Sequence, residues 1–221
     1  MNGNCEAWNE KWSKQNYPRK YPDFSVPGYG SDYEPATSIW MATLLDPLGN
    51  RFVEGIKLHD YGCGCARLFN FMTGFLKDFT YIGTEPVGSQ EMHLAKRFFG
   101  DDPRAIFMSC EDAVKSEEVM ASNAVILGSI FTHLLQDTCE DILKSLLPVI
   151  EKNGIIVFTV LFKPKAEAHR PGAHGFANCY GVSFQKEGWI EELENKFACK
   201  IEHVDIFETG HGVTHDVFRI K

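Results

Sequence analysis

A glycine turn near the start of an apolar run is the part of this sequence with the clearest chemical potential. In the stretch LHDYGCGCARL, Gly62 and Gly64 stand between a β-type run and a helical pattern that begins near Cys65. Two glycines at such a place allow a tight turn and let a ligand approach backbone amide groups at the start of a helix. A GxG alone is a weak signal, because many such turns only connect two elements.

An acid on the next β-type run strengthens this signal. Glu85 ends the stretch FTYIGTE, 21 residues after Gly64 (85 minus 64). An acid about 20 residues beyond such a turn can accept both hydroxyls of an adenosine ribose. The alternative is a solvated carboxylate at a strand end. Together, the turn and the acid predict a site for a ligand that contains adenosine.

The residue at the third glycine position separates two classes of such ligands. In the dinucleotide fingerprint GxGxxG, this glycine lets the helix pack closely on the strand and the pyrophosphate rest on the helix. Arg67 stands there in this sequence. Its bulk disfavours NAD and FAD, so an NAD-dependent oxidoreductase is the weakest of the alternatives.

The elements that must position these residues follow an α/β pattern. From Ile56 onward, short apolar runs alternate with helical patterns as far as the strand-like NGIIVFTVLF. This alternation predicts parallel strands, joined by crossover helices and buried on both faces. KIEHVDIF and THDVFRIK, separated by a turn with glycine, predict an antiparallel hairpin. We therefore expect a doubly wound, mostly parallel seven-stranded sheet with an antiparallel last strand. Helices are expected over 35–45, 66–77, 89–100, 134–150 and 186–197.

The first fifty residues differ in composition from the rest. Tryptophans and tyrosines lie there among prolines and glycines, which predicts a short helix, an aromatic loop and a second helix near Pro35 to Leu45. We interpret residues 1–50 as an aromatic-rich helical extension or lid packed on a domain formed by residues 51–221.

Composition limits the classes of partner. The 221 residues carry a formal net charge of -8, and the positive side chains are scattered, which argues against nucleic acid or an anionic membrane as the substrate. No stretch reaches the roughly 18 to 20 apolar residues of a membrane span, and the amino terminus lacks a secretory pattern. We expect a cytoplasmic protein. Its seven cysteines are an odd number without paired spacing, so we expect reduced thiols and no metal site.

The motifs together resemble a known family. DYGCGCARL is similar to the first motif of class I S-adenosylmethionine-dependent methyltransferases, in which an acid precedes GxG, and YIGTEPV is similar to the segment that ends in the ribose-binding acid. AVILGSIFTHL, LKSLLPVIEKNGIIVFTVLF and HDVFRIK resemble the later strands and helices. The resemblance runs from about Lys57 to Lys221, and it implies the Rossmann-like fold of that family.

The resemblance also implies roles for particular residues. Asp60, Gly62 and Gly64 would hold the methionine end of S-adenosylmethionine, and Glu85 its ribose. Further residues of the implied cofactor site are Cys63, Arg67 and Pro86 in the same segments, Glu111 or Asp112 near the adenine, and Ser129, Ile130 and Phe131, with Thr132, beside the sulfonium.

Some residues depart from the family pattern. Ala66 stands where the family usually has a third glycine, which narrows the turn, and Gly128 stands where many members have an acid or Asn. The Asn/Asp-Pro-Pro-aromatic motif of many base and glutamine amide methylases is missing. The stretch GYGSDYEPAT is similar to one in some small methyltransferases, where it would cover the cofactor, although its Ser and Thr could equally cap the next helix.

Several residues outside these motifs are candidates for acceptor chemistry. His133 follows the fourth strand, so it could act as a general base if the acceptor has a proton to lose, or it could cap the next helix. His174 is a second candidate base. His169 and Arg170, in the long segment after the fifth strand, could bind the substrate or simply be exposed. Tyr29 and Tyr33 in the extension could contact the substrate, and aromatic rings also favour cations such as a sulfonium.

The resemblance therefore implies an S-adenosylmethionine-dependent methyltransferase that acts on an oxygen or nitrogen of a small molecule or peptide and releases S-adenosylhomocysteine. One alternative is a non-catalytic domain that keeps the fold as a binding partner. The acceptor and the oligomeric state do not follow from the sequence.

Overall fold

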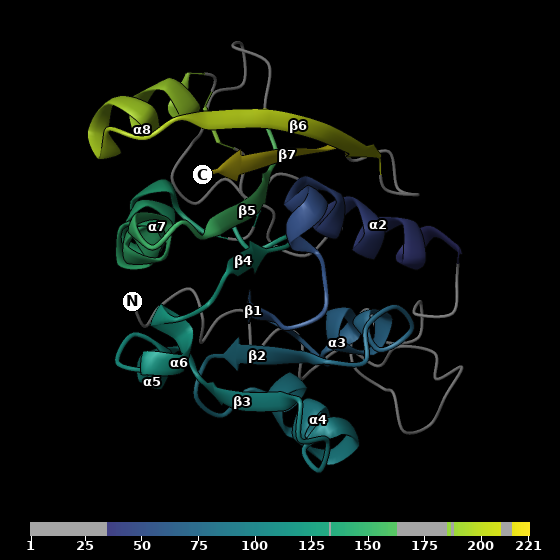
Figure 1. Ribbon diagram of the computed structural model, residues 1–221. Coiled ribbons are helices and arrows are strands. Elements are labelled where there is room, and N and C mark those ends of the chain that lie inside the picture. Colours follow the sequence, from purple (N-terminus) through teal and green to yellow (C-terminus); the bar gives the residue numbers. More distant parts are fainter. Residues whose placement is uncertain (1–34, 133, 163–184, 187, 209–213) are drawn as a thin grey trace, which may run out of the picture.

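A computed structural model describes residues 35–132, 134–162, 185–186, 188–208 and 214–221. Its centre is a seven-stranded sheet with the order β3-β2-β1-β4-β5-β7-β6, which Figure 1 shows nearly edge-on. Neighbouring strands from β3 to β5 are parallel, whereas β7 runs antiparallel to both β5 and β6. The predicted seven-stranded, mostly parallel sheet with an antiparallel last strand is confirmed.

Every predicted strand forms near its expected bounds. These strands are β1 (Ile56–Tyr61), β2 (Phe79–Glu85), β3 (Ala105–Ser109), β4 (Ala124–Leu127), β5 (Ile155–Val160), β6 (Ile201–Glu208) and β7 (Thr214–Ile220). All residues of β4 and β5 are buried, as expected for central parallel strands with helices on both faces.

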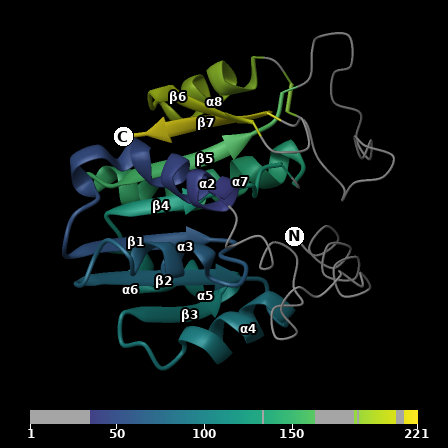
Figure 2. The same cartoon turned by 90° about the vertical axis from the view of Figure 1, so that its right-hand side faces the viewer.

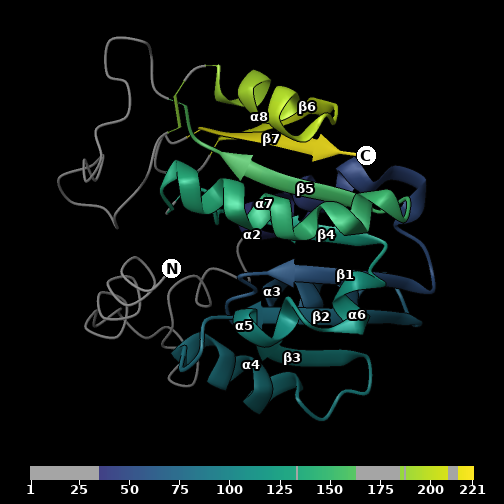
Figure 3. The same ribbon diagram turned by 90° about the vertical axis from the view of Figure 1, so that its left-hand side faces the viewer.

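Helices cover both faces of the sheet. They are α2 (Pro35–Leu45), α3 (Arg67–Met72), α4 (Gln90–Phe99), α5 (Cys110–Ala113), α6 (Glu117–Met120), α7 (Gln136–Glu151) and α8 (Trp189–Phe197), and α2 continues into a 3-10 helix, η1 (Asp46–Arg51). Figure 2 shows the face covered by α2, α3 and α4, and Figure 3 shows the opposite face with α5, α6, α7 and α8.

The helix starts follow ordinary capping chemistry. The side chains of Ser89, Ser109 and Ser116 each accept a backbone N–H at the start of α4, α5 and α6, which satisfies donors that have no partner within the helix. In α7, apolar residues at helical spacing are buried against the sheet: Cys139, Ile142, Leu143, Leu146 and Val149.

The helix after the glycine turn is shorter than predicted. We expected residues 66–77, starting near Cys65, but α3 begins at Arg67 and ends at Met72. It starts late because Ala66 still has a left-handed backbone, with φ 61°. After α3, the chain turns at Gly74 before β2, and the Thr73 hydroxyl donates to the Asn70 carbonyl at 2.6 Å.

The described part of the first fifty residues is built into the core. Met41, Leu44 and Leu45 of α2 and Leu48 of η1 are buried in one cluster with residues of β1 and β4. A Cβ atom at Gly128, at the end of β4, would lie 2.7 Å from Cδ1 of Leu44. A side chain at position 128, such as the acid or Asn in many members of the family that the motifs resemble, would therefore require the end of the Leu44 side chain to shift.

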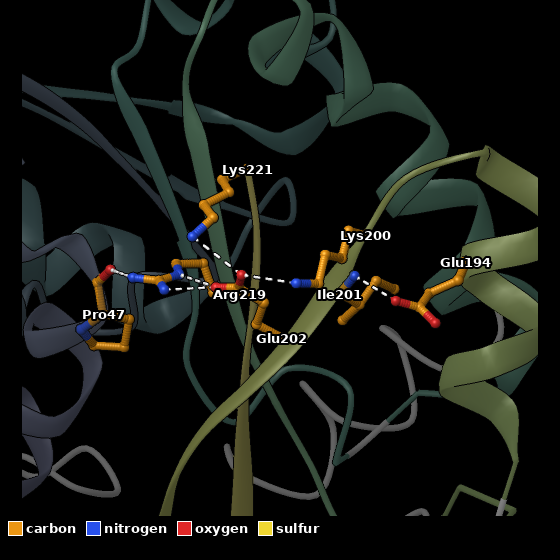
Figure 4. Close-up of polar contacts among 7 residues, drawn as sticks. All are labelled: Pro47, Glu194, Lys200, Ile201, Glu202, Arg219 and Lys221. Carbon is orange, nitrogen blue, oxygen red and sulfur yellow. Dashed lines mark hydrogen bonds and ion pairs between the residues drawn. The ribbon is translucent and has the colours of Figure 1, made fainter.

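A charged network joins η1 to the terminal hairpin. Arg219 on β7 donates from Nη2 to the carboxylate of its cross-strand neighbour Glu202 at 2.6 Å, and from Nη1 to the carbonyl oxygen of Pro47 at 2.7 Å. Figure 4 shows Lys200 and Lys221 on the same carboxylate, at 3.5 and 3.0 Å. Hydrogen bonds from Arg219 and Lys221 lower the pKa of Glu202 to about 2. The hairpin is thus tied to the chain that leads into β1.

Three features of the described residues bear on the composition arguments. Cys63, Cys65 and Cys139 are buried and Cys110 and Cys199 half-buried, all as free thiols. Within the described ranges no helix is long and apolar enough to cross a membrane. The same ranges contain no group of three or more metal-ligating side chains.

Candidate cofactor-binding site

The glycine turn and the acid of β2 meet at the carboxyl edge of the sheet. Asp60 pairs with Gly83 and Tyr61 with Thr84 across β1 and β2. The turn extends this pairing, because the amides of Gly62 and Cys63 both donate to the Thr84 carbonyl, at 2.8 and 3.0 Å. The residues that follow β1 and those that end β2 therefore lie at the same carboxyl edge of the sheet. Ligands of open α/β sheets bind at this edge.

Left-handed backbone conformations shape the turn. Gly62, Gly64 and Ala66 have φ values of 73°, 55° and 61°, a region in which glycine has no steric penalty and alanine pays one. Ala66 thus has the left-handed backbone that a glycine would adopt without strain, at the position where the family that the motifs resemble usually has its third glycine. The Ile130 side chain fills the space beside Gly62, whereas no atom of the described residues lies within 4 Å of a Cβ placed on Gly64. The turn is therefore open at Gly64.

Glu85 lies next to the glycine turn, as its spacing from Gly64 in the sequence predicts. The amide of Gly64 donates to its Oε1 atom at 2.6 Å. Burial, which outweighs this hydrogen bond, and the nearby charges of Glu91 and Asp60 raise the pKa of Glu85 to about 8. A carboxylate held in this way gains from ligand hydroxyls that donate to its ionised form.

Asp60 is the second carboxylate of the site. It is 6% exposed, and its Oδ2 atom accepts a hydrogen bond of 2.6 Å from the hydroxyl of Tyr81. Burial raises the pKa of Asp60 to about 6, against the lowering effects of Tyr81 and of the Arg67 guanidinium. The buried thiol of Cys63 belongs to the same turn, and its pKa is raised well above its usual value by burial and by the charges of Glu85 and Asp60.

The residues expected near the adenine lie at the same edge. Pro86 directly follows β2 and is half-buried, and Glu111 and Asp112 are exposed in the first turn of α5 after β3. Asp112 has a structural partner, since its Oδ2 accepts from the Ser109 hydroxyl at 2.7 Å.

The segment after β4, expected beside the sulfonium, is held to the neighbouring strand. The Ser129 amide donates to the hydroxyl of the buried Thr159 on β5 at 2.8 Å, and the Thr132 hydroxyl donates to the Ser129 carbonyl at 2.7 Å. Ser129 has φ 62°, a strained conformation for a residue other than glycine. The Phe131 ring is fully buried against Phe158, so its side chain packs in the core at this edge.

The remaining predicted residues lie outside the described ranges. They are the candidate bases His133 and His174 and the candidate substrate contacts Tyr29, Tyr33, His169 and Arg170.

Two polar residues of this region were not predicted from the sequence as site residues. Tyr81 is fully buried on β2, two residues before Gly83, and only the two-residue period of a strand could have placed it on the face of Glu85. Gln185 is also fully buried, and its Nε2 donates to the carbonyls of Phe131 and Leu134 at 3.0 and 3.4 Å. It reaches the segment after β4 from 54 residues away in sequence.

Comparisons with known proteins bear on the fold. No protein-family model and no curated protein matches the sequence. Solved structures do match its fold. Magnesium protoporphyrin IX methyltransferase (ChlM) from Synechocystis PCC 6803, with bound SAM, aligns over 99% of this chain and 97% of its own, at 12% identity and a TM-score of 0.63.

Two further structures have other activities in their names. The 1,6-didemethyltoxoflavin-N1-methyltransferase of Burkholderia thailandensis, bound to 1,6-didemethyltoxoflavin and S-adenosylhomocysteine, aligns over 85% of this chain and 78% of its own at 15% identity, with a TM-score of 0.56. The [4+2]-cyclase SpnF aligns over 80% and 79% at 15% identity, with a TM-score of 0.59. The chain thus has the Rossmann-like fold of the class I S-adenosylmethionine-dependent methyltransferases, the family that its motifs resemble.

Proposed function

We propose that this protein is a methyltransferase that binds S-adenosylmethionine at the glycine turn and transfers its methyl group to an oxygen or nitrogen of a small molecule or peptide. One observation carries the proposal. The Glu85 carboxylate lies against the Gly64 amide, beside open space, at the edge of the sheet where this fold binds ligands. That is the place at which a ribose can donate two hydroxyls to an acid.

The charges of the site fit this cofactor. S-adenosylmethionine presents an ammonium group, a sulfonium and two ribose hydroxyls, and two carboxylates, Asp60 and Glu85, flank the turn. Burial raises the pKa of both carboxyls, so each gains when a cation or a hydroxyl donor replaces the missing solvation. The pyrophosphate of NAD would instead rest at the turn, beside the like charge of Asp60.

The cofactor supplies a sulfonium methyl group that is already activated for attack. What remains for the protein is to hold the acceptor in line with that methyl and to exclude water, and such positioning contributes about 7 to 11 kcal/mol. Asp60, Gly62 and Gly64 would hold the methionine end, with Cys63 and Arg67 in the same turn. Ser129 and Ile130 would lie beside the sulfonium.

Other groups would complete the site in this proposal. Pro86 and Glu111 or Asp112 would border the adenine. A general base, His133 or His174, would remove a proton from an acceptor that must lose one, which adds about 100- to 10,000-fold. Tyr29, Tyr33, His169 and Arg170 would contact the acceptor.

A second function is a cofactor-binding protein without methyl transfer. The observation that favours it is the match to SpnF, because that structure with the same fold is named as a cyclase. Both functions require cofactor binding, so only a measurement of methyl transfer can distinguish them.

Calorimetry with S-adenosylmethionine, S-adenosylhomocysteine and NAD tests the cofactor. We expect both adenosylated ligands to bind with dissociation constants of about 1 to 100 μM, within the usual range for enzyme ligands, and NAD not to bind. Transfer of a labelled methyl group to fractions of a cell extract then tests the reaction. If neither adenosylated ligand binds, the proposed function is ruled out. If they bind but no methyl group is transferred to any fraction, the second function, a cofactor-binding protein without methyl transfer, is favoured.

The raised pKa values predict that ligand affinity depends on pH. Ribose hydroxyls bind best to an ionised Glu85, whose pKa is about 8, and the methionine ammonium to an ionised Asp60, whose pKa is about 6. If only the ionised carboxylates bind, the affinity for S-adenosylhomocysteine should rise by up to about 100-fold from pH 6 to pH 8, about 50-fold from Glu85 and about twofold from Asp60. Calorimetry across this range measures it, and a flat or falling profile contradicts the assignment of the two carboxylates.

A further inference from the structure

The hydrogen bond beneath the glycine turn joins two buried side chains on neighbouring strands. The Tyr81 hydroxyl donates to Oδ2 of Asp60 at 2.6 Å, and neither residue is more than 6% exposed. Tyr81 pairs with Leu58 in the sheet, and Asp60 pairs with Gly83. The tyrosine thus reaches diagonally to Asp60 along the strand, across the position at which Gly83 has no side chain.

The Tyr81 ring has little freedom to move. Its centroid lies 5.3 Å from that of Phe69 on α3 and 6.0 Å from that of Phe107 on β3. A ring held on two sides fixes the position of its hydroxyl. Burial raises the pKa of Tyr81 well above its usual value, so the hydroxyl stays protonated and remains a donor.

We propose that Tyr81 is a positioning residue of the cofactor site, whose hydroxyl fixes the orientation of the Asp60 carboxylate and keeps it ionised to receive a cationic group of the ligand. The inference rests on the proposed function, because it takes that group to be the ammonium of the methionine moiety. Tyr81 itself has no contact with the ligand in this arrangement.

Charged groups from several elements act on Asp60. Tyr81 and the Arg67 guanidinium on α3 favour its ionised form, and burial opposes it. Glu85 on β2 is coupled to it by like charge, and the Cys63 thiol of the turn feels both carboxylates. Among these groups, Tyr81 donates a hydrogen bond of 2.6 Å to the carboxylate. Removal of its hydroxyl should raise the pKa of Asp60 by about one unit, the effect of one hydrogen bond to a charged group.

The first test compares Tyr81→Phe with the natural protein by calorimetric titration of S-adenosylhomocysteine at several pH values. With a pKa near 6 raised by about one unit, the ionised fraction of Asp60 falls about fivefold at pH 6 and hardly at all at pH 8.5. We therefore expect binding about fivefold weaker at pH 6 and within about twofold at pH 8.5. Glu85 is unchanged in both proteins, so its titration cancels in the ratio.

Tyr61→Phe is the matched control. It removes a phenol hydroxyl from β1 that makes a side-chain hydrogen bond with Cys110. We expect its affinity ratio to stay constant with pH. A loss in Tyr81→Phe that is equal at every pH would show that the hydroxyl only supports packing, and would overturn the inference.

A second test needs no ligand. The carboxyl carbon of Asp60, labelled with carbon-13 and assigned by its disappearance in Asp60→Asn, reports the pKa directly by nuclear magnetic resonance. An upward shift of about one unit in Tyr81→Phe supports the inference, and an unchanged pKa overturns it. If S-adenosylhomocysteine fails to bind the natural protein, the proposed function fails, while this titration still decides whether Tyr81 controls Asp60.

Discussion

Replacement of Glu85 by Gln is expected to weaken the binding of S-adenosylhomocysteine about 100-fold, which corresponds to about 3 kcal/mol. The amide of Gly64 can still donate to the oxygen of the new side chain, as it now does to Oε1 of Glu85 at 2.6 Å. The turn therefore keeps its structure. What disappears is a charged acceptor for two ribose hydroxyls, each worth about 1.5 to 3 kcal/mol. Isothermal titration calorimetry at pH 8.5, where Glu85 is mostly ionised, measures the loss.

Glu91→Gln provides the control for net charge. Glu91 lies in the first turn of α4 and acts on Glu85 only through its charge, which raises the pKa of Glu85. Its removal should leave the affinity unchanged or slightly higher, because Glu85 ionises more readily. Equal losses in the two variants would mean that general electrostatics, and not a ribose contact, explains the result.

The same Glu85→Gln variant should be more stable than the natural protein at high pH. The pKa of Glu85 is raised in the folded state to about 8 from 4.5, so folding favours the protonated form. Stability is therefore lost as the pH rises from about 4.5 to about 8, and Gln avoids this loss. Because Glu85 is only half-buried, we expect a gain of about 1 to 2 kcal/mol at pH 8.5, or about 3 to 6 °C in Tm, and none at pH 4.5. Thermal denaturation at both pH values checks this.

Gly64→Ala should block the ligand while leaving the protein folded. A Cβ at Gly64 meets nothing within 4 Å, so the added methyl group would project into the space proposed for the cofactor. Ala66 in the same turn already adopts a left-handed backbone, which shows that alanine is tolerated in this conformation. We expect a loss of stability of about 1 to 2 kcal/mol from the positive φ and at least a tenfold loss of affinity for S-adenosylhomocysteine.

Gly55→Ala is the control that separates the loss of stability caused by a positive φ from the loss of ligand affinity. Gly55 also has a positive φ, of 82°, and open space around its Cβ position, but it precedes β1 at the amino edge of the sheet, opposite the turn. The two variants should lose similar stability, measured by denaturant unfolding, and only Gly64→Ala should lose ligand affinity. Unchanged affinity in Gly64→Ala would place the ligand elsewhere.

The sheet could be predicted from the sequence because its signals are local. Ile56–Tyr61 forms β1 with the expected bounds, since apolar runs bounded by turns specify buried parallel strands. The helix after the turn was predicted too long, because periodicity continues through Gly74 although the backbone turns there. A similarly local pattern located the terminal hairpin.

The site could be predicted only as far as its motif extends along the chain. The spacing between Gly64 and Glu85 anticipated two residues that the structure joins by a hydrogen bond. The contact between Tyr81 and Asp60 depends on strand register, and that between Gln185 and Phe131 on the return of a distant segment. Such contacts arise from tertiary packing, which a single sequence does not display. The burial of Phe131 was missed for the same reason.

The contact between Leu44 of α2 and the end of β4 has a consequence for the evolution of this fold. Because a Cβ at position 128 would lie 2.7 Å from Cδ1 of Leu44, a larger side chain at 128 fits only where the leucine side chain shifts or a smaller residue stands at 44. Relatives should therefore fall into two groups, one with a bulky residue at 44 and glycine at 128, the other with a smaller residue at 44 and a polar side chain at 128. Paired substitution at these two sites would show that the contact between the helix and the strand end constrains both positions.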